Sequence, residues 1–322
     1  MIKFVLRRLL FMIPVLIIIS IVTFSLMKLT PGNPWDKGDG QRQMSQQQQD
    51  ILNRKFNLDK PQWEQYLLYM AGVVTRLDFG PSLQYKDRNV TEILFQASGD
   101  NPFWDSQFGR SALLGLMAVA IAVLIGLPLG VLAAVKQNTW IDYFSLFLAT
   151  LGVSVPSFVM AIFFILLFSL TLHWFPTNYA TANGDWKAWI MPVLVLSFGL
   201  IAYMARLTRA TMLETIRQDY VRTARAKGLT ERVVILKHAL KNSLIPVATV
   251  LGPAIAGLIT GTFFIEFMFT FPGMGRNFVQ SVQQRDYSMI MATTLFYAFV
   301  ISLANLTVDI VYGWLDPRIK VQ

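Results

Sequence analysis

Six long apolar runs constrain this chain more than any other feature. Ionisable residues occur only near their ends, and charge-free runs of about 20 residues are typical of helices that cross a membrane. Of the 322 residues, 15% are charged, whereas soluble domains carry about 25%. The sequence therefore predicts an all-α membrane protein with six transmembrane helices: Leu9–Met27, Ser111–Val135, Tyr143–Leu172, Ile190–Ala205, Leu244–Phe269 and Ser288–Val308.

The first run is interpreted as a membrane span and not as a cleaved signal peptide, because it is long and no small-residue cleavage site follows. Within the other runs, Pro156 predicts a kink. The Gly126-xxx-Gly130 spacing predicts close approach of another helix. A second pair with this spacing, Gly257 and Gly261, lies in the fifth run.

The distribution of positive charge predicts the topology. With both termini cytoplasmic, the inside segments hold fifteen Lys and Arg, and the two short outside loops hold three. This agrees with the positive-inside rule, which long translocated domains escape. The predicted organisation is a first helix within 1–29, a helical extracytoplasmic domain at 30–108, a membrane domain with the other five spans at 109–313 and a cytoplasmic tail at 314–322. The expected location is a cell membrane.

Several motifs that would indicate an energy source for transport are missing from the sequence. The chain has no cysteine, no GxxxxGK[ST] phosphate loop and no ionisable group deep in a span, which argues against an ATPase, a metalloenzyme and a proton-driven carrier. No catalytic residue, metal site or cofactor of its own is therefore predicted, and the net charge of +9 is attributed to inside loops and not to nucleic-acid binding. If the chain drives transport, another subunit must supply the energy.

The basic stretch Arg206–Ser243 is the one inside surface large enough for such a subunit. It predicts a helix over Thr211–Lys227, ended by Gly228, then a short helix capped by Thr230 with an apolar face of Val233, Leu236 and Leu240. Ala224 and Ala226 are expected to leave a thin face for another backbone. The pattern equally allows an amphipathic helix lying on anionic lipid.

Several motifs resemble the ABC importer permeases, and more narrowly the first of the two permease subunits of the dipeptide/oligopeptide branch. The segment from Asp219 to Leu229 and the Leu244-Ile-Pro246 run resemble the EAA loop of that family. Arg222-Thr223-Ala224 stands where the general pattern has Glu-Ala-Ala, and the segment Phe95–Phe108 resembles an insertion. Further matching motifs are Leu29–Pro34, Asp78-Phe-Gly80 with Ser82, Ser154–Phe158, Phe271–Gly275, Arg285-Asp-Tyr287 and Asp316-Pro-Arg318.

The resemblance implies that 109–313 is a type I importer permease domain in the cell membrane of a prokaryote. Such a permease works with a second similar permease, two ATP-binding subunits and an extracytoplasmic solute-binding protein. ATP and Mg²⁺ would be used by the partners, and the cargo would be a peptide. An oligosaccharide, nickel or glutathione remains an alternative cargo. A passive channel, a membrane scaffold and a secondary carrier remain alternative functions.

Two groups of residues are predicted to carry these roles. The expected ATPase-coupling interface is Asp219, Tyr220, Arg222, Thr223, Ala224, Arg225, Ala226, Lys227, Gly228, Leu229, Thr230 and Glu231. The expected translocation path contains Ser154, Ser157, Thr249, Thr260 and Thr262, although hydroxyls in spans commonly bond their own helix.

Overall fold

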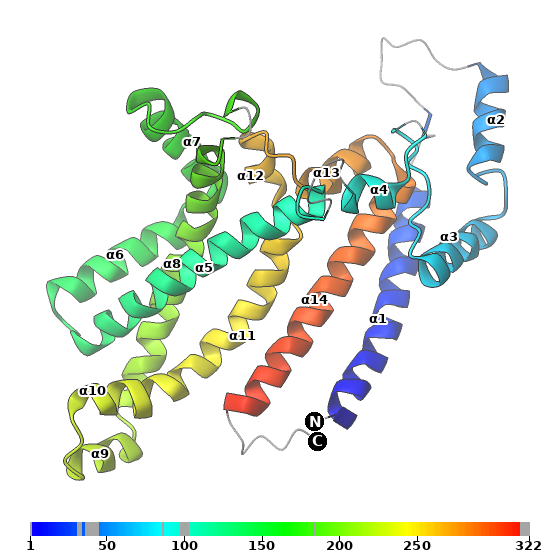
Figure 1. Ribbon diagram of the computed structural model, residues 1–322. Coiled ribbons are helices and arrows are strands. Elements are labelled where there is room, and N and C mark those ends of the chain that lie inside the picture. The colour runs from blue at the N-terminus through cyan, green and yellow to red at the C-terminus, as the bar shows by residue number, and fades with distance from the viewer. Residues whose placement is uncertain are drawn as a thin grey trace. The chain divides into compact units, whose positions relative to one another are not determined.

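Helices make up nearly all of the regular structure in the part of the chain that the computed structural model describes, namely residues 2–30, 34–35, 45–85, 87–96, 103–182 and 185–315 (Figure 1). Three sequence motifs lie partly or wholly outside those residues: Asp316-Pro-Arg318, Pro31–Asn33 of the Leu29–Pro34 motif, and 97–102 of the Phe95–Phe108 segment.

The chain divides into two compact units. One contains Met1–Val5, Ser111–Pro272 and Ile301–Gln322, and the other contains Leu6–Arg110 and Gly273–Val300. The predicted permease domain at 109–313 is therefore shared between the two units. We call them the larger unit and the cap unit, and each is described by itself.

Five described helices are long and apolar enough to cross a membrane. They are α1 (Ile2–Leu29), α5 (Gln107–Val135), α8 (Lys187–Ile216), the run Glu231–Met268, whose longest helix is α11 (Leu240–Ile259), and α14 (Tyr287–Leu315). A sixth candidate is a bent pair, α6 (Trp140–Ser154) followed by α7 (Ser157–Phe164) and a π-helical segment to Thr171. These elements account for all six predicted spans.

The break between α6 and α7 confirms the predicted kink at Pro156, but the angle between the two helices is larger than that of a kinked helix. The two helices meet at 106°. Pro156 has no N–H to donate and disfavours helical backbone at the preceding residue, and Val155 accordingly adopts an extended conformation with φ −90° and ψ 122°. The third predicted span is thus two helices.

Glycines bring α5 and α6 against α8 in the larger unit. A Cβ placed on Gly126 would lie 3.0 Å from the carbonyl oxygen of Ile201, and one on Gly130 would lie 2.6 Å from that of Ala205. Gly152 of α6 meets Ala202 of α8 in the same way. The close approach predicted from the Gly126-xxx-Gly130 spacing is confirmed. Helices α5 and α6 thus both pack closely against α8.

The fifth predicted span, Leu244–Phe269, lies almost entirely within the candidate span Glu231–Met268, but it is not one continuous helix. Helix α11 ends at Ile259, and a separate short helix α12 (Phe263–Met268) follows. Gly261 lies in the break with φ +96°, a conformation that glycine adopts without the penalty other residues incur. Gly257 faces open space, so this second glycine pair does not form a packing motif.

The cap unit contains the predicted helical segment between the first two spans. It comprises α2 (Gln46–Lys55), α3 (Gln62–Arg76) and α4 (Val90–Phe95), together with most of α1, α13 (Gly275–Gln283) and the beginning of α14. Ser45 and Gln48 form a reciprocal capping box that starts α2. Its core packs Val90 and Leu94 against methionines of the α13–α14 region.

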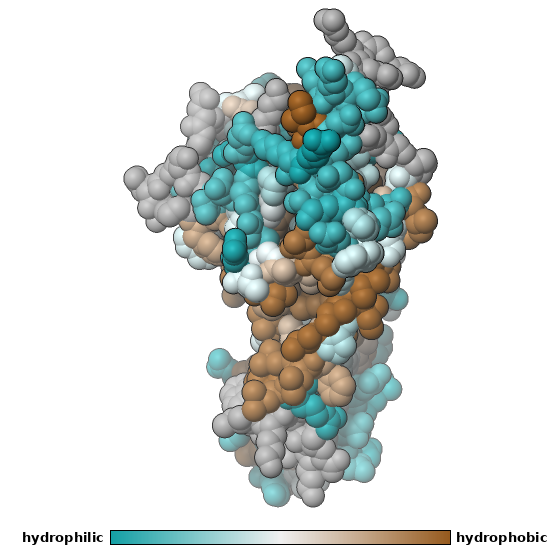
Figure 2. Space-filling model, turned by 90° about the vertical axis from the view of Figure 1, so that its right-hand side faces the viewer, coloured by the Kyte–Doolittle hydropathy of each residue, from teal (hydrophilic) through white to brown (hydrophobic). Residues whose placement is uncertain are grey.

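Helix α1 exposes most of its apolar surface within this unit. Leu10, Ile18 and Leu26 are each at least 60% exposed, and Figure 2 shows hydrophobic side chains gathered over α1, with hydrophilic side chains gathered over the α2 and α3 part. Such a division suits a helix in lipid that ends beneath a solvated cap.

Candidate functional site

The predicted coupling segment begins with a break that the sequence did not predict. Helix α8 ends at Ile216, Gln218 is extended with φ −71° and ψ 149°, and α9 starts afresh at Asp219 and ends at Ala226. The prediction of one helix over Thr211–Lys227 is therefore wrong. The break lets α9 change direction from α8, as the lower left of Figure 1 shows.

Gly228 ends α9 as predicted. Its φ is +75°, its N–H donates to the carbonyl of Arg225 at 2.9 Å, and no atom lies within 4 Å of a Cβ placed on it. The left-handed conformation and not a lack of space is therefore what favours glycine here.

The second helical piece starts at the predicted place. Thr230 occupies the N-cap position of α10 (Glu231–Val233), which continues into a π-helical segment, η3 (Val234–Ala239). The threonine side chain makes no capping hydrogen bond. Instead the carboxylate of Glu231 accepts from Arg225 at 2.7 and 3.1 Å. This ion pair closes the turn around Gly228, although its exposure limits its contribution to about 1 kcal/mol or less.

The segment has a small core of its own. Val221, Ala224 and Val234 are buried against one another, so the space beside Ala224 is filled by this same chain. The prediction that Ala224 offers a thin face to another backbone is wrong, while Ala226 is exposed. Leu240 also packs inward, against Met212 and Ala239, and so does not lie on the exposed apolar face that was predicted for it with Val233 and Leu236.

An apolar surface nevertheless remains on the segment. Tyr220, Leu229, Val233 and Leu236 are 38–50% exposed. Exposed basic residues surround them, at Arg222, Lys227, Arg232 and Lys237. We call these eight residues the coupling surface. Apolar side chains held on a compact turn and ringed by charge match the composition of a protein-binding patch.

A buried ion pair, not predicted from the sequence, ties α6 to α8 near this segment. The guanidinium of Arg209 donates to Asp142 from Nε at 2.5 Å and from Nη2 at 2.8 Å, and the N–H of Asn138 adds a third bond at 3.0 Å. Asp142 is 1% exposed. A bidentate pair of this kind fixes orientation as well as distance, so it sets how α6 lies against the helix that leads into the coupling segment.

The five predicted path residues occupy different environments. Ser154 and Ser157 are exposed on either side of the α6–α7 break. The hydroxyls of Thr249 and Thr260 donate to carbonyls of their own helix, at 3.1 and 2.8 Å, and Thr260 is fully buried. Thr262 stands just before α12. Their role in translocation stays a prediction.

Glu266 is a second buried carboxylate, which the sequence placed only near a span end. It is 0% exposed. Its Oε1 accepts from the hydroxyl of Ser111 at 2.8 Å and from the N–H of Thr262 at 3.1 Å. It therefore joins the start of α5 to the first turn of α12 inside the larger unit.

Two of the sequence motifs meet in the cap unit. The carboxylate of Asp286, in the Arg285-Asp-Tyr287 motif, accepts from the hydroxyl of Ser82 and from the N–H groups of Leu83 and Met289. Asp286 is 1% exposed. The loop after α3 is thereby attached to the start of α14, about 200 residues later in the chain.

Tyr69 lies beside this junction. Its hydroxyl donates to the carbonyl of Ser288 at 3.4 Å. Burial, and then the negative charges of Asp286 and Asp78, raise the pKa of the Tyr69 phenol far above its usual value. The phenol therefore stays protonated and remains a hydrogen-bond donor. Among the described residues, no three His, Cys, Asp or Glu side chains gather as metal ligands.

Comparison with known families covers almost the whole chain. Residues 126–321 match the model of the binding-protein-dependent transport system inner membrane component. Residues 1–86 match the N-terminal model of the membrane component of binding-protein-dependent transport systems. A crystal structure of an amino acid ABC transporter with histidines aligns at a TM-score of 0.47 and 18% identity, covering 65% of this chain and 91% of that one.

Full-length relatives agree with the family models. The dipeptide transport system permease protein DppB of Bacillus subtilis is 40% identical over 100% of this chain and 99% of its own length. The oligopeptide transport system permease protein OppB of Escherichia coli K12 is 40% identical over 99% of this chain and 100% of its own. The chain therefore belongs to the family of binding-protein-dependent transport system inner membrane components.

Proposed function

We propose that this chain is the permease subunit of an ABC importer and that its cargo is a peptide. The permease relatives named for dipeptide and oligopeptide transport support the cargo. In this proposal a solute-binding protein delivers the peptide, a second similar permease completes the pathway, and two ATP-binding subunits supply energy. ATP and Mg²⁺ act on those subunits, and this chain binds no cofactor itself.

The coupling surface is the observation that carries the proposal. Leu236 and Tyr220 are 50% and 41% exposed. In the isolated chain their apolar area stays in water, which is unfavourable in free energy compared with burial against a partner. A groove on an ATP-binding subunit would remove that area from water and complement the surrounding basic charge. The turn that carries the coupling surface is closed by Gly228 and by the Arg225–Glu231 ion pair. Force applied to this surface therefore reaches η3 and α8 without passing through a loose linker.

The proposed orientation follows from charge. The coupling segment and both termini lie on the cytoplasmic side, because the inside segments then carry most of the Lys and Arg outside the long 30–108 region. Residues 30–108 would then face the binding protein. ATP-driven closure of the two ATP-binding subunits would move the coupling segments and switch the pathway between inward-open and outward-open states.

The first test replaces an apolar side chain of the coupling surface. Leu236→Lys is expected to reduce recovery of the ATP-binding subunits with the tagged chain at least tenfold, and to reduce ATP-dependent uptake of a labelled dipeptide equally. Glu214→Lys is the matched control, since Glu214 is also exposed and lies two residues before the end of α8. Normal recovery and uptake in Leu236→Lys would contradict the coupling role.

Three further measurements separate the alternative functions and cargoes. If the wild-type chain is recovered without any ATP-binding subunit, a passive channel or scaffold is favoured instead. Uptake that survives ATP depletion but stops with an uncoupler would indicate a secondary carrier. Competition of labelled dipeptide uptake by unlabelled oligopeptide, glutathione, oligosaccharide or nickel identifies the cargo class.

A further inference from the structure

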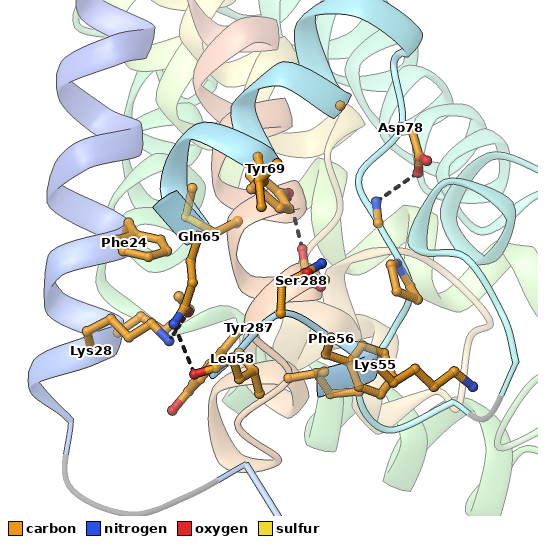
Figure 3. A pocket seen from close by; sticks show the side chains of 18 residues that line it. Phe24, Lys28, Lys55, Phe56, Leu58, Gln65, Tyr69, Asp78, Tyr287 and Ser288 are labelled. Carbon is orange, nitrogen blue, oxygen red and sulfur yellow. Dashed lines mark hydrogen bonds between the residues drawn. The ribbon is translucent and has the colours of Figure 1, made fainter. Parts of the chain in front are cut away.

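A hollow in the cap unit is not used by the proposed transport function. It has a volume of about 260 Å³ and lies where the end of α1 meets α3 and the start of α14. Figure 3 shows its lining, in which Lys28 and Phe24 come from α1, Gln65 and Tyr69 from α3, and Tyr287 from α14. The lining is mostly apolar, and its charged members are Lys28, Lys55 and Asp78.

Lys28 is the charged lining residue that could bind a ligand. A lysine in the last turn of a membrane helix ordinarily extends into water, but Lys28 is half-buried. Its ammonium donates to Oε1 of Gln65 at 2.7 Å and lies 4.8 Å from the centre of the Tyr287 ring. Within the described part of the chain, no carboxylate forms an ion pair with it.

The other two charged groups are already engaged. Asp78 accepts from the N–H of Gly80 at 2.8 Å and from the amide of Asn89 at 2.7 Å. Lys55 pairs with Asp87 at 3.1 Å. Among the described residues, a ligand in the hollow would therefore meet one cation, Lys28, that has no carboxylate paired with it, and this favours an anionic group.

The orientation of Gln65 supports this assignment. Its amide nitrogen donates to the carbonyls of Leu58 and Lys60, at 3.1 and 2.7 Å. The amide is thus held with its oxygen toward Lys28. The ammonium keeps a defined position and has two further protons with which to bind a ligand.

An apolar groove adjoins the hollow. A second cavity of about 240 Å³ shares Met27 and Tyr287 with the first and is lined by Leu26, Val282 and Ile290. Leu26 is 60% exposed, as is Ile18 two turns earlier on α1. Arg285 also lines this second cavity. Lys28, in the last turn of α1, therefore stands at the end of an apolar strip along a helix whose composition places it in lipid.

We propose that this site binds an anionic phospholipid, with the phosphate at Lys28 and an acyl chain along Leu26, Val282 and Ile290. Pockets for drug-sized ligands usually measure about 300–1,000 Å³, so a hollow of about 260 Å³ has the size for a single lipid headgroup. The bound lipid would neutralise Lys28 and brace α1 against α3 and α14. This proposal is independent of the cargo.

The test measures lipid binding to the purified full-length chain in detergent. Phosphatidylglycerol with a fluorescent acyl tail is titrated into wild type, Lys28→Gln, Lys28→Arg and Lys55→Gln. We expect at least tenfold weaker binding for Lys28→Gln only, because Lys28→Arg keeps the charge and Lys55 already has an acid partner. Unchanged binding in Lys28→Gln would overturn the proposal.

Competitors distinguish the sources of the anion. Unlabelled phosphatidylglycerol should displace the probe, whereas glycerol 3-phosphate, diacylglycerol and a dipeptide should not. Displacement of the probe by glycerol 3-phosphate, which has no acyl chain, would mean a free-phosphate site. Displacement by the dipeptide would mean a peptide site. Either result overturns the lipid assignment. A phosphatidylglycerol with a photoreactive tail gives a measurement that needs no variant: it should label peptides containing 23–30 and 282–290, and labelling elsewhere only would contradict the site.

Discussion

Removal of the Asp142 charge should loosen α6 from α8. Asp142→Asn keeps the shape of the side chain, but it turns an acceptor into an amide whose N–H₂ would face the donors of Arg209. Three hydrogen bonds depend on the carboxylate, two from Arg209 and one from Asn138. The substitution also leaves a guanidinium, 19% exposed, without its counter-charge.

The size of the effect follows from burial. Removing one partner of a buried ion pair costs about 3–5 kcal/mol. Because Arg209 keeps some contact with solvent and Asn retains one acceptor, we expect about 3 kcal/mol. In a double-mutant cycle with Arg209→Gln, the coupling energy should be about 2 kcal/mol, since the double variant leaves no buried charge.

The assay exploits the absence of cysteine from the chain. Ser145, one turn beyond Asp142 on α6, is 2% exposed, so a Ser145→Cys background carries one thiol that a maleimide reaches only when α6 opens. A loss of about 3 kcal/mol corresponds to a labelling rate roughly 100-fold faster. The matched control is Asp219→Asn in the same background, because the side chain of Asp219 is 98% exposed and its charge should not matter.

Two results would refute this reasoning. One is a labelling rate for Asp142→Asn within threefold of the background. The other is a double-mutant cycle in which the effects of the two substitutions simply add, because additivity means that the side chains do not interact in the folded protein.

The remaining predictions concern single side chains. Gly130→Val should lower the free energy of unfolding by about 1–3 kcal/mol, because its Cβ meets a carbonyl of α8 at 2.6 Å; Gly257→Ala, in open space, is the control, and equal thermal stability of the two variants would contradict the packing. Gly228→Ala should cost about 1 kcal/mol locally because of its positive φ, seen as faster proteolysis of residues 217–240 with an unchanged thermal midpoint for the whole chain. Asp286→Asn should speed proteolytic cleavage between residues 77 and 90, and unchanged cleavage would mean that the carboxylate does not hold that loop. Because the pKa of Tyr69 is raised in the folded protein, the free energy of unfolding should fall as pH rises above about 10, the usual phenol value, and Tyr69→Phe should lessen that fall.

Local features were the part of the fold that could be predicted. The six apolar runs, the Pro156 break, the Gly126–Gly130 contact and the turn at Gly228 each depend on residues adjacent in sequence or on one helical face. Where local rules were extended too far, they failed. Gln218 interrupts the helix expected over Thr211–Lys227, although no proline or glycine marks the position.

Long-range polar contacts could not be predicted in this way. Asp142 and Arg209 are 67 positions apart, Ser111 and Glu266 155, and Ser82 and Asp286 204. The sequence shows that each charged residue stands near a helix end, but not which partner the fold brings to it. For the same reason Lys28 reads as an ordinary charge at the end of a span, and only the structure places it beside Gln65 and Tyr287.

The sequence by itself determined the class of this protein: a helical membrane chain of the transport family, with a turn at Gly228 and no phosphate loop of its own. Those properties follow from hydropathy, helix-ending residues and motifs, which are written along the chain. Tertiary structure alone decided which side chains remain available to partners. Ala224 and Leu240 are consumed in packing while Leu236 stays exposed, because burial depends on the elements that fold against each residue and not on its own chemistry.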